Sequence, residues 1–173
     1  MKLFKALLTA ASLALISTSA VQAESPLPRS GDKLVKFGDV GDWTVYENTT
    51  RGDCLIVTED GNGAVQMGVT AENKGLGYLG VFTKQDIGLG KKKNSKIFVS
   101  IGGNLYEGVA TQVSEHLKGG YMGGYILSNN PQFREDVAKK YKMIVFPDTI
   151  GAFVVDLTGT FNAMKMARKC FLK

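Results

Sequence analysis

The chain has 173 residues, a formal net charge of +5, and hydrophobic and charged fractions of 44% and 21%, values typical of one folded domain rather than a disordered chain. Two cysteines and a single histidine, His116, exclude a thiolate-rich zinc site, an iron–sulfur cluster and a multi-histidine metal site, so no metal or cofactor is expected. The charge excess is too small to favour nucleic acid as a partner.

The first 23 residues have the pattern of a secretory signal peptide. Lys2 and Lys5 precede the apolar run 7–16, and the segment ends in Val21-Gln22-Ala23, with small residues where signal peptidase cleaves. The apolar run is too short for a membrane helix, and no later run is long enough. We therefore expect cleavage after Ala23 and a periplasmic or secreted protein without a transmembrane segment.

The next segment, residues 24–36, is polar and contains prolines, which predicts a flexible leader before a single β-rich domain at 37–173. Short β-branched or aromatic segments then alternate with glycine-containing turns about every ten residues. They are 43–46, 54–58, 65–69, 78–82, 96–101 and 105–108. This spacing favours antiparallel strands in a β-sandwich-like arrangement.

The C-terminal third predicts two short helices. Asn130 and Pro131 supply an N-cap and a first helical residue, and Glu135-Asp136 place acids early in that helix. Its apolar face is predicted to hold Phe133, Val137 and Tyr141.

Two further strands are expected at 143–146 and 153–157, and Gly159-Thr160 begins the last helix. One face of that helix would carry Ala163, Met164, Ala167, Cys170 and Phe171. The overall prediction is a mainly β fold with two short helices in the C-terminal third.

The cysteines are Cys54, on a predicted strand, and Cys170, on the buried face of the last helix. Export to an oxidising compartment favours a disulfide between them, and their spacing excludes a Cys-x-x-Cys redox motif. The alternative is two free buried thiols.

Candidate catalytic residues are few. His116 is the one histidine that could serve as a base, no Gly-x-Ser-x-Gly elbow accompanies it, and a solvated position is favoured. The acid pairs Glu59-Asp60 and Glu135-Asp136 have turn and helix-start explanations. Asp156 interrupts an apolar strand, where period-2 alternation predicts an outward-facing side chain. We therefore expect a protein that is not an enzyme.

Two segments suggest binding. Lys91, Lys92, Lys93 and Lys96 form a dense cationic run that could hold an anionic glycan or lipid, although a solvated hairpin tip is the favoured interpretation. Residues 119–125 are rich in glycine and tyrosine. They could bind sugar by stacking, but a loop whose tyrosines cover the core is favoured.

Three motifs carry a family resemblance: residues 41–46 (Gly-Asp-Trp-Thr-Val-Tyr), 54–56 (Cys-Leu-Ile) and 155–163, followed by Cys170. With the signal peptide, they make the chain similar to the invasion-associated locus B family of small exported alphaproteobacterial proteins. The resemblance implies a β-rich envelope protein, linked in some pathogens to host-cell invasion, and it brings no catalytic residues.

The sequence thus predicts an exported, non-enzymatic protein that is envelope-associated or binds a ligand, with an envelope protein or an anionic glycan or lipid as partner. The alternative is an inhibitor or accessory protein that docks on an envelope enzyme or polysaccharide. A hydrolase ranks third.

Overall fold

The computed structural model of the chain describes residues 27–29, 31–61, 63–70, 75–89, 95–111 and 120–173. They form one ten-stranded sheet with two helices, and all of its strand pairings are antiparallel. The elements are β1 (Leu34–Val40), β2 (Trp43–Asn48), β3 (Asp53–Glu59), β4 (Gly63–Val69), β5 (Gly77–Thr83), β6 (Lys96–Ile101), β7 (Asn104–Thr111), β8 (Met122–Ser128), α1 (Pro131–Lys139), β9 (Lys142–Val145), β10 (Phe153–Asp156) and α2 (Thr160–Phe171). The predicted mainly β class with two helices is confirmed.

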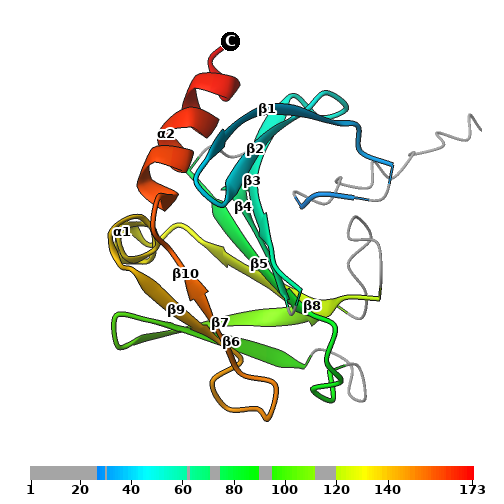
Figure 1. Cartoon of the computed structure of the whole chain (residues 1–173), viewed down its shortest axis with the longest axis vertical. Coiled ribbons are helices and arrows are strands. Elements are labelled where there is room, and N and C mark those ends of the chain that lie inside the picture. Colours follow the sequence, from blue (N-terminus) through cyan, green and yellow to red (C-terminus); the bar gives the residue numbers. More distant parts are fainter. Residues whose placement is uncertain (1–26, 30, 62, 71–74, 90–94, 112–119) are drawn as a thin grey trace, which may run out of the picture.

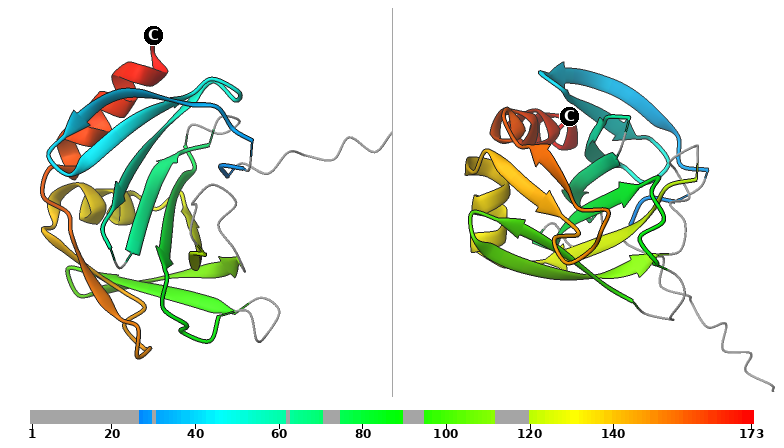
Figure 2. Two further views of the ribbon diagram at one scale, coloured as in Figure 1. Left: turned by 45° about the vertical axis from the view of Figure 1, so that its right-hand side comes forward. Right: turned by 60° about the horizontal axis from the view of Figure 1, so that its bottom comes forward.

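The strand order is β1-β2-β3-β4-β5-β8-β7-β6-β9-β10. The two layers expected of a sandwich are therefore two halves of one continuous sheet, joined where β5 pairs with β8. Figures 1 and 2 show the sheet bent around α1 and α2, which lie together on its inner side.

The main core fills the space between this inner face and the two helices. Val45, Ile56, Val81 and Val99 point into it from both halves of the sheet, and Ala163 and Cys170 from α2 complete it. The indole Nε1 of buried Trp43 donates a hydrogen bond to the carbonyl of Thr158 at 3.0 Å, which ties β2 to the start of α2. Because the inward residues are apolar on every strand, burial fixes which face of each strand is inside.

A smaller cluster lies on the outer face of the sheet. It contains Leu55, Ala64, Tyr78, Phe82, Tyr121 and Tyr125. Leu27 and Leu34 pack against it, and β1 begins at Leu34, within the stretch expected as a leader. The carboxylate of Asp32 accepts hydrogen bonds from the backbone N–H of Arg29 and from Asn48 Nδ2, which holds the described residues before β1 against the turn between β2 and β3.

The expectation of a loop at 119–125 is wrong, because β8 begins at Met122 and lies between β5 and β7. Its glycines allow the close approach: a Cβ at Gly123 would collide with the carbonyl oxygen of Val81, and one at Gly124 with that of Val109. The expectation that the tyrosines cover the core is confirmed, since Tyr121 and Tyr125 are buried.

The start of α1 is as predicted: the Asn130 side chain accepts a hydrogen bond from the backbone N–H of Gln132, and Pro131 follows it. The helix ends at Lys139, however, so Tyr141 lies outside it and is 74% exposed, contrary to its predicted place on the apolar face. The acids are also not in the first turn; Asp136 lies farther along and is fully buried.

Candidate functional site

A groove of about 930 Å³ lies between α1 and α2, above the ends of β3, β4 and β5. Its volume is at the upper end of the roughly 300–1,000 Å³ typical of small-molecule sites. The groove is the candidate functional site.

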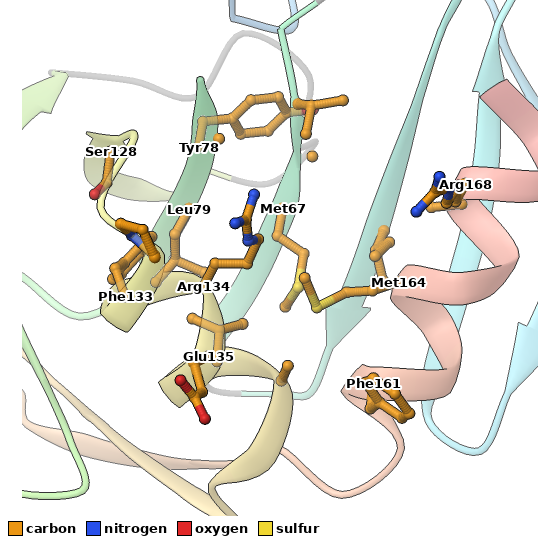
Figure 3. Close-up of a pocket in the computed structure, with 18 of the residues that line it drawn as sticks. Met67, Tyr78, Leu79, Ser128, Phe133, Arg134, Glu135, Phe161, Met164 and Arg168 are labelled. Carbon is orange, nitrogen blue, oxygen red and sulfur yellow. The ribbon is translucent and has the colours of Figure 1, made fainter. Parts of the chain in front are cut away.

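The floor of the groove is apolar. It is formed by Ile56 from β3, Met67 from β4 and Leu79 from β5, all of which are buried. Phe133 closes the α1 side. In Figure 3 the side chain of Met164 extends from α2 toward that of Met67, so two flexible thioethers lie in the middle of the lining.

The two helices forming the walls are held together at one end of the groove. Thr160 Oγ1, at the start of α2, donates a hydrogen bond to the carbonyl of Val137 on α1 at 2.8 Å. Along α2, Met164, Ala167 and Phe171 line the groove and remain half-buried. Apolar side chains of α2 are thus left partly uncovered along the groove.

The disulfide fixes the α2 wall. Cys54 on β3 is joined to Cys170 on α2, with Cα atoms 6.2 Å apart, which fits the pairing expected from the sequence. Both cysteines are buried, and Cys54 also lines the groove. The covalent bond therefore links the floor of the groove directly to one of its walls.

The α1 wall is fixed by a buried carboxylate. Asp136 accepts hydrogen bonds from Tyr106 and Asn104 at 2.7 Å and from Gln132 at 2.9 Å. Burial alone would raise the pKa of Asp136, but these three hydrogen bonds together with the positive charge of Lys140 hold the pKa below its ordinary value. The ring of Tyr106 also packs edge-on against Phe133, with ring centroids 4.7 Å apart, so this network supports a lining residue.

The rim of the groove is cationic. Two of its cations are engaged: Lys139 is paired with Glu135 at 2.6 Å, and Lys165 lies 4.2 Å from the centroid of the Phe161 ring. The other two, Arg134 on α1 and Arg168 on α2, are exposed, and neither guanidinium has a partner among the described residues. Glu135 is the one carboxylate among the described lining residues. The site therefore combines an apolar interior with an uncompensated positive rim.

Of the other candidate site residues predicted from the sequence, the structure places Lys96 and Asp156. Lys96 is exposed at the start of β6 and is paired with Glu107 at 2.8 Å, away from the groove lining. Lys91, Lys92 and Lys93 lie outside the described residues, as does His116.

Asp156 is exposed on β10, as its alternation predicted. Hydrogen bonding from the Thr158 side chain and from its backbone N–H, the latter at 2.7 Å, lowers the pKa of the Asp156 carboxyl. This local turn accounts for an acid at the end of an apolar strand.

Sequence reasoning identified the apolar face of the last helix but not the groove. Met164, Ala167 and Phe171 were predicted on that face, and the structure leaves them half-buried. A signal was present in Arg168, which follows Met164 by one turn and so borders the same face. Arg134 is next to the predicted core residue Phe133, and no sequence pattern distinguished it from other surface cations.

Comparison with protein-family models, with curated proteins and with solved structures finds no significant match. Within the described part of the chain, neither helix has the length and apolar character needed to cross a bilayer.

Proposed function

We propose that this chain is an exported, non-enzymatic binding protein that holds a small apolar ligand in the groove between α1 and α2. The observation that carries the proposal is the groove itself, about 930 Å³ in volume and floored by Ile56, Met67 and Leu79. A preformed apolar cavity of this size suits a small ligand, because burying the ligand's apolar surface supplies the affinity.

The lining supports binding rather than chemistry. The groups facing the cavity floor are hydrocarbon and thioether side chains, and Met67 and Met164 can adapt to ligands of different shape. The buried network around Asp136 is engaged in supporting α1, with all three of its hydrogen bonds made within the protein.

The disulfide and the N-terminal pattern support an extracytoplasmic location. A disulfide between Cys54 and Cys170 is stable in an oxidising compartment such as the periplasm. Residues 1–23 have the composition of a secretory signal. The resemblance to the invasion-associated locus B family points to the same envelope location.

A second candidate function is docking on an envelope protein, as an inhibitor or accessory protein. It is favoured by an apolar strip on the outer face of the sheet, made of Leu105, Val109, Ile144 and Val154, which are 41–62% exposed. Ile144 on β9 pairs with Val154 on β10 and with Ser100 on β6, and Ser100 pairs in turn with Leu105 on β7. Leu105, Ile144 and Val154 therefore lie in one row across the sheet. We call this the outer strip.

The test uses Nile red, a neutral apolar dye whose fluorescence rises when it leaves water. We expect the native protein to bind it and Ala167→Trp, which places an indole in the groove, to weaken binding at least tenfold. Asn162→Trp is the matched control, because Asn162 is exposed on the same helix and does not line the groove. Far-ultraviolet circular dichroism would show that both variants remain folded.

Binding that survives Ala167→Trp but is lost in Ile144→Lys would place the apolar site on the outer strip and favour the docking alternative. Absence of Nile red binding to the native protein would overturn the groove proposal.

A further inference from the structure

We infer that the ligand of the groove is a single-chain amphiphile whose anionic head group is held between Arg134 and Arg168. This inference rests on the proposed function and adds the chemical class of the ligand. It is carried by the distribution of charge around the groove, which differs sharply between floor and rim.

The first step concerns the charges that line the groove. Of the four cations on its rim, Lys139 and Lys165 already have partners, an ion pair with Glu135 and a cation–π contact with Phe161. The guanidinium groups of Arg134 and Arg168 have none among the described residues. The rim thus keeps two positive charges that a bound anion would neutralise.

The second step concerns position. Arg134 and Arg168 stand on opposite walls; Figure 3 shows the Arg134 side chain reaching from α1 toward Met67, and the Arg168 side chain on the groove side of α2. Beneath them lie Met67 and Leu79, which are buried and apolar. A ligand that satisfies both regions must have an apolar body and a charged end at the opening.

The third step concerns the head group. A guanidinium presents a planar fork of donors that matches the paired oxygens of a carboxylate or a phosphate monoester, and two such groups favour an anion over a neutral or cationic head. A flexible alkyl chain suits the floor because Met67 and Met164 can follow its course. A peptide with an acidic residue is the competing occupant, and the test includes it.

The experiment compares detergents that share a dodecyl chain and differ in head group, each used below its micelle concentration and measured by displacement of Nile red. Dodecyl phosphate and dodecanoate are the anionic probes, dodecyl maltoside is neutral, and dodecyltrimethylammonium is cationic. Inorganic phosphate alone tests whether the head suffices, and an acidic amphipathic peptide tests the competing occupant. We expect both anionic probes to bind at least tenfold more tightly than the neutral and cationic ones.

The variants are Arg134→Gln, Arg168→Gln and the double substitution. Each single change should weaken the anionic probes about three- to tenfold, and the double change should abolish their advantage over dodecyl maltoside. Lys169→Gln is the matched control, because it removes the same charge from the position next to Arg168 but does not line the groove. Added salt should weaken the anionic probes and leave the neutral one unchanged.

The outcomes separate the two proposals. Equal binding of all head groups, still sensitive to Ala167→Trp, would overturn the head-group inference and leave the groove function standing. If Lys169→Gln and Arg168→Gln weaken binding of the anionic probes equally, the head-group inference is also overturned, because the loss would then reflect the net charge of the protein and not a contact made by Arg168. Binding of the peptide but of no detergent would replace the amphiphile with a protein partner. No groove-dependent binding of any probe, Nile red included, would overturn the proposed function itself.

Discussion

The hydroxyl of Tyr106 on β7 donates a 2.7 Å hydrogen bond to the carboxylate of Asp136, which is fully buried on α1. The same carboxylate oxygen accepts from Asn104 Nδ2, at the start of β7. A single acid therefore connects the second helical turn of α1 to one strand of the sheet. Because Tyr106 also packs against Phe133, the position of the groove wall depends on this connection.

We expect Asp136→Asn to lower the free energy of unfolding by about 1–3 kcal/mol. Both carboxylate oxygens of Asp136 accept hydrogen bonds, whereas an asparagine amide has only one acceptor oxygen. Tyr106→Phe should cost about 1 kcal/mol, and the double variant less than the sum. Urea denaturation at pH 7 followed by the fluorescence of Trp43 measures all three. Glu135→Gln is the control: its ion pair is exposed, so it should cost well under about 1 kcal/mol. An equal loss in Glu135→Gln would contradict the role of Asp136.

Stability should decline in alkaline solution between pH 10 and 12. Burial, followed by hydrogen bonds to carboxylates, raises the pKa of Tyr106 and of Tyr121 to about 12, from 10 in the unfolded chain. The native state therefore holds these protons while the unfolded state releases them, so the stabilisation present below pH 10 is lost as pH rises through 12. Urea midpoints across this range, with tyrosinate absorbance at 295 nm, provide the measurement. A flat profile to pH 12, or one unchanged by Tyr106→Phe, would argue against it.

Removal of the disulfide should loosen α2 and the groove together. We expect no free thiol in the denatured, unreduced protein, and a loss of about 2–5 kcal/mol in the double variant Cys54→Ala/Cys170→Ala. Nile red affinity should fall in that variant, because the bond links the floor of the groove to its α2 wall. Thiol titration, urea denaturation and dye binding test the three statements. Native-like dye affinity in a folded double variant would show that packing alone positions α2.

The sequence predicted most strands because short runs of β-branched and apolar residues, such as 54–58 and 96–101, are separated by turn residues. It missed β8 because glycine usually marks a turn, whereas here glycine is required by close contact with the neighbouring strands. The groove was missed for another reason. In the sequence, the helical spacing of Met164 is the same whether its side chain is fully buried or lines a groove. The distance between the two helices is set by tertiary contacts, such as the hydrogen bond from Thr160 to Val137, which the sequence does not reveal.

The role of the β8 glycines can be tested directly. Gly123→Ala should destabilise the protein by about 1–3 kcal/mol or more, because its methyl group would strike the carbonyl of Val81 and force β5 and β8 apart. Gly61→Ala is the matched control, since Gly61 is exposed and a Cβ there would meet nothing within 4 Å. Thermal unfolding of both variants gives the comparison, and similar midpoints would contradict the packing argument.

Processing gives the last prediction. We expect the exported protein to begin at Glu24, because small residues at Val21 and Ala23 precede a polar segment. Intact mass and N-terminal sequencing of protein recovered from the periplasm or medium would test this. Ala23→Asp should slow cleavage and retain the longer form. A native exported protein that still carries Lys2 or Lys5 would be incompatible with it.

The strand order also has a consequence for the folding pathway. Strands β1 to β5 pair in chain order and need only short turns to meet, whereas the chain leaves this meander at Thr83 and returns to its edge at Met122. Closing the long loop costs more entropy than closing a hairpin, so we expect local pairs to form ahead of the β5–β8 pair. The β6–β7 hairpin is local as well. In that order, the pairing of β8 with both β5 and β7 is the step expected to join the two halves of the sheet into one cooperative unit.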